Sequence, residues 1–189
     1  TKFNEDLEKL VRNCADCQEA AKSPVKNTLS SCPHPDAPWS RIHIDFAGPM
    51  DGMSNLVVVD AFSKWPEVIP MTYTTSTATL RDLRRLFAQF GLPQIIVSHT
   101  GTQFTSVEFQ NFCRNNGIKH VRSPPFHQRS NGQAERFVDN FKRSLAKVEN
   151  NGLTVDALQA FLFTYRNTQC TALPFGRSSA ENFIGRRLR

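Results

Sequence analysis

Three side chains capable of metal or proton chemistry stand where the sequence predicts strand ends or a helix start. Asp45 ends the segment IHID, His99 follows the segment QIIVS, and Glu135 lies in the first turn of a long predicted helix. Side chains at such points are held rigidly enough to converge. Carboxylate oxygens suit Mg²⁺, and two such ions can clamp the attacking and leaving oxygens of a phosphodiester. Asp45 and Glu135 are therefore candidates for a metal-dependent nuclease or strand-transfer site, the alternative being that an aspartate after an apolar strand is common and has no such role.

The elements that lead to Asp45 and His99 are a predicted β-meander, a helix and a further strand. Residues 41–49 alternate apolar and polar side chains, which is typical of a strand with one polar face, and Gly48-Pro49 is expected to end it. Residues 54–60 form an apolar run that suits a strand buried on both faces, and PEVIPM predicts a third strand. A helix predicted over 75–91 crosses over to QIIVS, which is therefore expected to be a parallel strand. The buried stripe of this helix is expected to comprise Leu80, Leu83, Leu86, Phe87 and Phe90.

The second half of the main domain positions Glu135. A helix is predicted over 106–116, a fifth strand over IKHVRS, and the longest helix over 130–151, where Ser130 and Gln133 fit a capping box. A last helix is predicted over 154–166, and the remaining tail is expected to be irregular and basic. The order β-β-β-α-β-α-β-α-α implies an α/β fold, a mixed five-stranded sheet with helices on both faces.

Composition favours a polyanionic partner. The chain has 189 residues, a net charge of +6 and 39% hydrophobic residues, enough for a packed core. A basic balance points to nucleic acid first, although a basic but inert surface remains the alternative. No apolar run is long enough to span a membrane and no signal segment opens the chain. The five scattered cysteines favour a reducing compartment.

The N-terminal stretch is expected to be separate from the main domain. Residues 1–22 predict a short amphipathic helix that runs into Cys14-x-x-Cys17, which is half of a tetrahedral Zn²⁺ site. The other half of that site is expected upstream of Thr1, because the chain looks like a piece of something longer. Residues 23–40 are rich in proline and serine and predict a linker. Residues 41–189 are the expected main domain with its basic tail.

Several motifs in a fixed order resemble the catalytic core of retroelement integrases of the gypsy/Ty3 class and their retroviral relatives. They are HIDFAGPM, NLVVVDAFSKWPE, QIIVSHTGTQFTS and KHVRSPPFHQRSNGQAER, and the resemblance runs from about Trp39 to Arg187. The segment EKLVRNCADCQEAAK is similar to the Cys-Cys half of the integrase zinc-binding domain, whose His pair is absent here. The resemblance implies a ribonuclease-H-like fold, which agrees with the predicted element order.

The resemblance also assigns the catalytic positions. The family motif is Asp, Asp and Glu with 35 residues between the last two; Asp45 and Glu135 match the first and third. The second position is occupied by His99, with the spacing of 35 intact, and Thr100 replaces the neighbouring family Asn. Imidazole is a poor ligand for Mg²⁺, and replacing the family aspartate by histidine removes one negative charge from the site. His99 is therefore interpreted as a solvent-facing residue of a degenerate site or as a ligand retuned to Mn²⁺ or Zn²⁺. Residual one-metal activity and an error in the sequence are the further alternatives.

DNA contacts and partners are implied by the same resemblance. The expected DNA-binding residues are Lys142, Arg136, Arg143, Asn131 and Gln133. The expected cofactor is Mg²⁺ or Mn²⁺ at Asp45 and Glu135, with Zn²⁺ only if the missing ligands exist upstream. A homodimer, nuclear localisation and DNA integration by 3′-end processing and strand transfer follow from the family, with activity impaired by His99. The alternative is a catalytically dead, domesticated or remnant module that binds nucleic acid or dimerises.

Overall fold

The computed structural model describes residues 35–50, 52–122, 139, 142–144, 147, 155–171, 173 and 176–189. These residues belong to one compact unit, Ser31–Arg189. Among its described helices, none combines the length and the apolar character that a membrane crossing requires.

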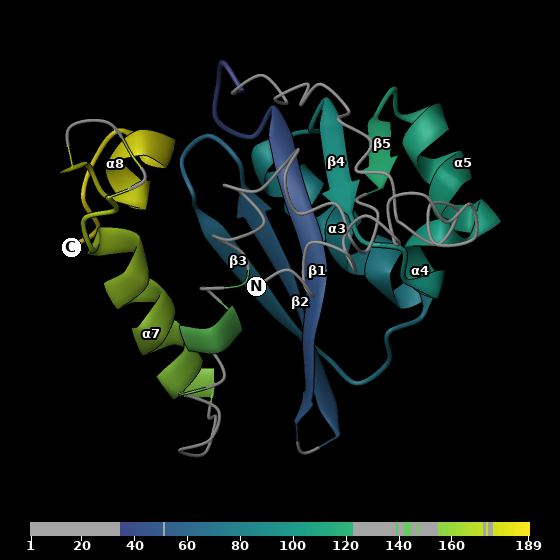
Figure 1. The fold of residues 1–189 in the computed structure, drawn as a ribbon, viewed down its shortest axis with the longest axis horizontal. Helices are drawn as coiled ribbons and strands as arrows, with labels where there is room; N and C mark the ends of the chain where they lie inside the picture. Colours follow the sequence, from purple (N-terminus) through teal and green to yellow (C-terminus); the bar gives the residue numbers. More distant parts are fainter. Residues whose placement is uncertain are drawn as a thin grey trace, which may run out of the picture. The chain divides into compact units, whose positions relative to one another are not determined.

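Five strands form one mixed sheet in the order β3-β2-β1-β4-β5 (Figure 1). The strands are β1 (Arg41–Met50), β2 (Met53–Asp60), β3 (Pro66–Met71), β4 (Ile95–Ser98) and β5 (Lys119–Arg122). The first three make the antiparallel meander predicted from the sequence, while β4 runs parallel to β1, and β5 runs parallel to β4. The predicted mixed five-stranded sheet is therefore confirmed, and its central strand is the one that carries Asp45.

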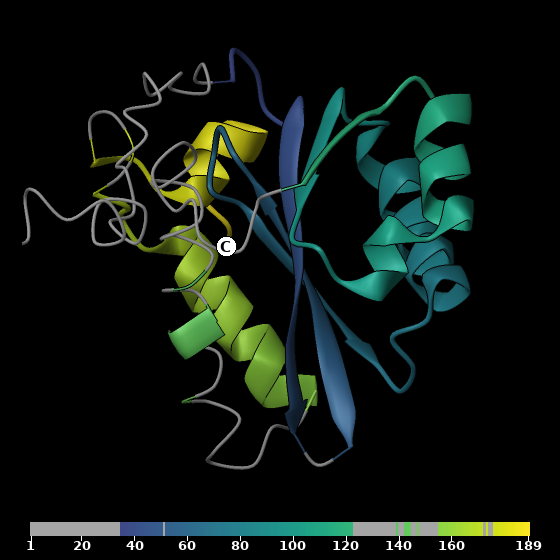
Figure 2. The same ribbon diagram turned by 45° about the vertical axis from the view of Figure 1, so that its right-hand side comes forward.

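One face of the sheet is covered by α3 (Ser76–Phe90), α4 (Thr102–Thr105) and α5 (Val107–Asn115), as Figure 2 shows. The side chains of Ile42 and Ile44 on β1 point into this layer and are buried against Leu80 and Leu83 of α3 and Phe109 of α5. The helix α3 begins with a side-chain cap from Thr75 and ends at Gly91, whose φ of 86° is strained for residues other than glycine. The predicted inward stripe is confirmed, with Phe90 only partly buried.

The opposite face is covered by α7 (Val155–Asn167) (Figure 2). Leu158 and Leu162 pack against Val57, Val59 and Val68 of the sheet. The residues of β2 are thus buried on both faces, because Leu56 and Val58 point into the other layer. Helices on both faces were predicted, and the two apolar layers confirm it.

The end of α7 is fastened to β3 by one arginine. The Arg166 guanidinium forms an ion pair with Glu67 at 2.9 Å and donates to the Pro66 carbonyl at 2.8 Å. It also lies 4.1 Å from the centroid of the Trp65 ring. A guanidinium stacked on an indole and paired with a carboxylate fixes direction as well as distance.

Two local predictions were wrong, and one short helix was not predicted. Gly48-Pro49 does not end β1, which continues to Met50 through a cis peptide and a register irregularity against β2. The predicted helix over 106–116 is confirmed as α5, and the short helix α4 that precedes it was not predicted. The tail is not irregular, because Ser178 and Glu181 form a capping box that starts α8 (Ser179–Ile184).

Trp39, at the end of the expected linker, is buried in the core of the main domain. Its ring lies 4.7 Å from Phe90 and 5.7 Å from Phe183 of α8, centroid to centroid. Its indole N–H donates to the Gly91 carbonyl at 2.9 Å, and its backbone N–H donates to Asp60 at 2.9 Å. Contacts of this kind join the entry of the domain to its C-terminal helix.

Candidate active site

The parallel register of β1 and β4 places Asp45 next to His99. Ile44 is the register partner of Ser98, the last residue of β4, so the residue that follows each of them lies at the same edge of the sheet. Ile44 faces the α3 layer, and the side-chain alternation of a strand turns Asp45 to the other side. The convergence predicted for these two positions is therefore observed.

Both carboxylate oxygens of Asp45 are engaged. Oδ1 accepts from the backbone N–H of Phe46 at 2.8 Å and lies 2.9 Å from Nδ1 of His99. Oδ2 forms an ion pair with the ammonium of Lys142, which belongs to a helical stretch at residues 142–144. Three donors thus converge on one carboxylate, and the side chains remain partly accessible: 27% of Asp45, 46% of His99 and 23% of Lys142.

The imidazole of His99 is held on two further sides. Its ring meets Phe104 edge to face, with the centroids 5.5 Å apart. A Cβ placed on Gly101 would lie 2.8 Å from Nε2 of His99, closer than atoms tolerate. The glycine therefore leaves the space that the ring occupies. His99 is half exposed but directed at Asp45, so it is not simply solvent-facing as one interpretation held.

A second histidine lies behind this loop. The hydroxyl of Ser98 is 2.8 Å from Nε2 of His120 on β5 and 3.0 Å from the carbonyl oxygen of His99. Burial, assisted by Arg122, lowers the pKa of His120. The neutral ring can donate its Nε2 proton to the hydroxyl, which then donates to the carbonyl. These two hydrogen bonds of the Ser98 hydroxyl hold the backbone at His99 in place.

The described part of the site does not fit a pair of Mg²⁺ ions. Its donor set is one carboxylate, one imidazole and one ammonium, and the carboxylate is already engaged by three donors. Mg²⁺ needs free oxygen ligands in octahedral geometry. Among the residues that the structure describes, no group of three His, Cys, Asp or Glu side chains could hold a metal ion.

The remaining predicted site residues divide into two groups. The first lies outside the described residues and comprises Glu135, Asn131, Gln133, Arg136, Cys14 and Cys17. The second group lies within the described residues: Arg143 is exposed to solvent, and Lys142 forms an ion pair with Asp45. The ion pair of Lys142 with Asp45 was not predicted from the sequence. The available signal was the spacing of seven residues between Glu135 and Lys142, which puts two side chains on one face of a helix.

Asp60, the other aspartate of the sheet, has a structural role. It is fully buried and accepts hydrogen bonds from the backbone N–H of Trp39 at 2.9 Å and of Ser63 at 2.8 Å. The Ser63 hydroxyl adds a third bond at 2.5 Å. A carboxylate satisfied in this way ties a turn and does not face the site.

A buried histidine on β1 precedes Asp45 by two residues and was not singled out from the sequence. His43 is 5% exposed, and its Nε2 has no hydrogen-bond partner among the described residues. Burial, with the positive charges of Lys64 and Arg41, lowers its pKa to about 3. The ring is therefore neutral at physiological pH, and it adds no charge beneath the site.

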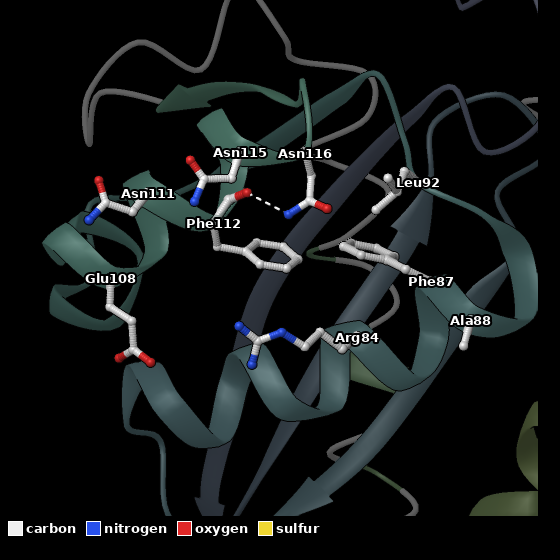
Figure 3. Close-up of a pocket in the computed structure, with 9 residues that line it drawn as sticks. All are labelled: Arg84, Phe87, Ala88, Leu92, Glu108, Asn111, Phe112, Asn115 and Asn116. Atoms are coloured by element: carbon white, nitrogen blue, oxygen red, sulfur yellow. Dashed lines mark hydrogen bonds between the residues drawn. The ribbon is translucent and has the colours of Figure 1, made fainter.

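A separate pocket of about 590 Å³ lies between α3 and α5 (Figure 3). Phe87 and Phe112 form its buried wall, and the Arg84 guanidinium lies 5.2 Å from the centroid of the Phe112 ring. Glu108 is the one acidic residue among those that line it. None of its lining residues belongs to the Asp45 cluster, so this pocket is not the expected site of phosphodiester chemistry.

The sheet order, the helices on both faces and the acidic end of the central strand define an α/β domain of the ribonuclease-H-like class. Comparisons with known proteins agree. Residues 35–128 match the family model described as "Integrase core domain". The HTLV-2 integrase catalytic core domain, solved in complex with magnesium in a trimeric form, aligns with 78% of this chain and 97% of its own (TM-score 0.60, 25% identity). A dimeric form of the same domain aligns at a TM-score of 0.59.

Two sequence relatives place the chain more closely. It is 44% identical over 188 residues to "Uncharacterized protein K02A2.6" of Caenorhabditis elegans. That alignment covers 99% of this chain and 15% of the worm protein. It is 30% identical over 155 residues to the Pro-Pol polyprotein of simian foamy virus type 3 (strain LK3), covering 77% of this chain and 13% of that protein. The chain thus spans a small part of each relative. It belongs to the integrase core family, as a catalytic core of the retroelement type.

Proposed function

We propose that this chain is the DNA-binding integrase core of a retroelement polyprotein in which metal-dependent phosphoryl transfer is impaired. The observation that carries the proposal is the 2.9 Å contact of His99 Nδ1 with Asp45 Oδ1, at the position where the family places a second carboxylate. A nitrogen donor aimed at the first carboxylate competes with a metal ion for it. The loss of one negative charge weakens the site further, because two divalent ions carry four positive charges.

DNA is the proposed partner because the chain is basic and carries exposed cations close to Lys142. The net charge is +6, and Arg143 and Lys147 are exposed on the segment that also carries Lys142. Such contacts give binding that depends on salt and little on sequence. A homodimer is proposed by analogy with the dimeric form of the HTLV-2 core. DNA integration would place the protein in the nucleus, which imaging of a tagged chain tests.

The test of the activity is a 3′-end processing and strand-transfer assay on a labelled duplex, run with Mg²⁺ and with Mn²⁺. The chain as given should yield little or no product with either ion. His99→Asp restores the family donor set and should raise the yield at least tenfold. An active chain whose product is lost in Asp45→Asn would show that the site is intact despite His99.

The alternative is a remnant or domesticated module that keeps the fold and DNA binding without chemistry. The same contact of His99 with Asp45 favours it, because it removes metal ligands while leaving the surface unchanged. It predicts that His99→Asp also fails to process DNA ends, although it binds DNA as well as the parent chain. Anisotropy with a labelled duplex and the product assay together separate the two functions.

A further inference from the structure

His99 and His120 are joined by two separate routes. The first route is the pair of hydrogen bonds of the Ser98 hydroxyl, which lies 2.8 Å from Nε2 of His120 and 3.0 Å from the carbonyl oxygen of His99. The second route runs through the rings of Phe104 and Phe109. From His99 through these two rings to His120, the successive centroids are 5.5, 5.6 and 5.0 Å apart. The five residues thus form a closed loop of contacts.

The four partners of His99 in this loop are held by the fold, whereas His99 itself is half exposed. Phe104 and Phe109 are fully buried, Ser98 is 3% exposed, and His120 is half-buried on β5. An exposed side chain loses rotamer entropy when it is fixed in one direction. The contact that His99 makes with the carboxylate therefore needs support, and the buried part of the loop supplies it.

The hydrogen-bond route has a definite direction. The Ser98 hydroxyl carries one proton, which it donates to the carbonyl oxygen of His99. Its oxygen must then accept from His120, so Nε2 of His120 carries the ring proton. Burial, with the charge of Arg122, lowers the pKa of His120 and keeps its ring neutral. At His99 the proton lies on Nδ1, which donates to Oδ1 of Asp45 at 2.9 Å.

We propose that His120 is a positioning residue that holds the side chain at position 99 against Asp45. It acts on the backbone of that residue through Ser98 and on its ring through the two buried phenylalanines, from a strand that β4 separates from β1. The inference deepens the proposed function, which rests on the same contact of His99 with Asp45. Because the bond to the carbonyl does not depend on the side chain, the Ser98 route should also hold an aspartate at position 99.

The experiment determines by nitrogen–proton NMR, in the full chain at pH 8, which nitrogen of each imidazole is protonated. We expect Nδ1 of His99 and Nε2 of His120. In Ser98→Ala and in His120→Leu, the ratio of Nδ1-protonated to Nε2-protonated His99 should fall about fivefold, the factor that corresponds to one lost hydrogen bond. His120→Gln should retain most of the ratio, because its amide N–H can donate to the Ser98 hydroxyl in place of Nε2.

Val121→Ala is the matched control, because Val121 follows His120 on β5 and strand alternation turns it to the other face of the sheet. It removes apolar contacts without entering either route. Equal falls of the ratio in Val121→Ala and His120→Leu would overturn the inference. An unchanged ratio in His120→Leu would also overturn it, and so would a proton on Nδ1 of His120. Thermal unfolding reports whether each variant is folded.

The product assay on labelled DNA gives a second readout in the His99→Asp background. There His120→Leu should lower the yield about fivefold, while His120→Gln should retain most of it. Equal yields with and without His120→Leu would overturn the inference. The absence of product from His99→Asp itself would contradict the proposed impairment by His99, and the NMR result on the chain as given would still decide the role of His120.

Discussion

Ile44 of β1 and Ser98 of β4 are register partners in a parallel pair, and this pairing makes Asp45 and His99 neighbours. The two residues are far apart in the chain, yet one hydrogen-bonded strand pair determines their separation. A replacement at position 99 therefore changes the hydrogen bonds and the charge at Asp45 directly, and several consequences can be measured.

His99→Asp should lower stability without metal and restore it with metal. Two carboxylates would stand side by side, at a cost of about 1 kcal/mol, which corresponds to about 2–4 °C in Tm for a chain of this size. Mg²⁺ should raise the Tm of the variant and leave that of the parent chain unchanged, as differential scanning calorimetry would show. The control is His99→Asp with Asp45→Asn, whose Tm should not respond to Mg²⁺. A response in the parent chain would contradict the expected lack of a Mg²⁺ site.

Gly101→Ala should displace the His99 ring from Asp45. The added Cβ would lie 2.8 Å from His99 Nε2, while the backbone of Gly101, with φ −60° and ψ 144°, accepts alanine without strain. Nitrogen–proton NMR of the imidazole should show loss of the hydrogen-bonded Nδ1 signal. In a His99→Ala background the same substitution should have no effect on stability. An unchanged Nδ1 signal would mean that the loop yields in place of the ring.

The buried His43 should make the protein less stable in acid. Its folded pKa of about 3 is below the ordinary value of 6.5, so the unfolded chain binds a proton more readily. Stability from this group is complete above pH 6.5 and is lost as the pH falls toward 3. Between pH 7 and pH 5 the loss should be about 2 kcal/mol.

Urea unfolding at pH 7 and pH 5 measures this loss. His43→Leu removes the titrating group and the ring nitrogen that has no partner among the described residues. The variant should lose about 2 kcal/mol less than the parent chain over the same interval. Equal losses in both proteins would show that His43 is protonated in the folded state as easily as in the unfolded one.

Arg166→Met should loosen α7 from β3. The change removes the ion pair with Glu67, the bond to the Pro66 carbonyl and the stacking on Trp65. Both charged side chains are nearly buried, at 18% and 19% exposure, so the unfolding free energy should fall by about 2–3 kcal/mol. Arg166→Lys keeps the positive charge but not the planar guanidinium, so its unfolding free energy should lie between those of Arg166→Met and the parent chain. Chemical denaturation measures both, and a loss below 0.5 kcal/mol in Arg166→Met would contradict the anchoring role.

Local sequence pattern was sufficient for most of the fold. Strand and helix types could be predicted because each local pattern indicates which face of the element is buried. These patterns are the alternation in β1, the apolar run of β2 and the apolar stripe of α3 from Leu80 to Phe87. The ends were harder. Gly48-Pro49 looked like a stop, but pairing with β2 carries the strand onward to Met50. The Ser178–Glu181 capping box was present in the sequence, yet only the contacts of Phe183 with Trp39 and Trp65 give α8 a core to pack on.

The sequence by itself determined the family motifs, the sheet and the position of His99 as the departure from the three-acid pattern. Tertiary structure alone decided what Asp45 does, because side-chain partners depend on strands and helices that the chain brings together from far apart. Lys142 follows Glu135 by seven residues in the sequence, but only the folded chain brings its ammonium to Asp45. The carboxylate predicted to bind metal is therefore paired with Lys142 and His99, a charge balance that no single segment encodes.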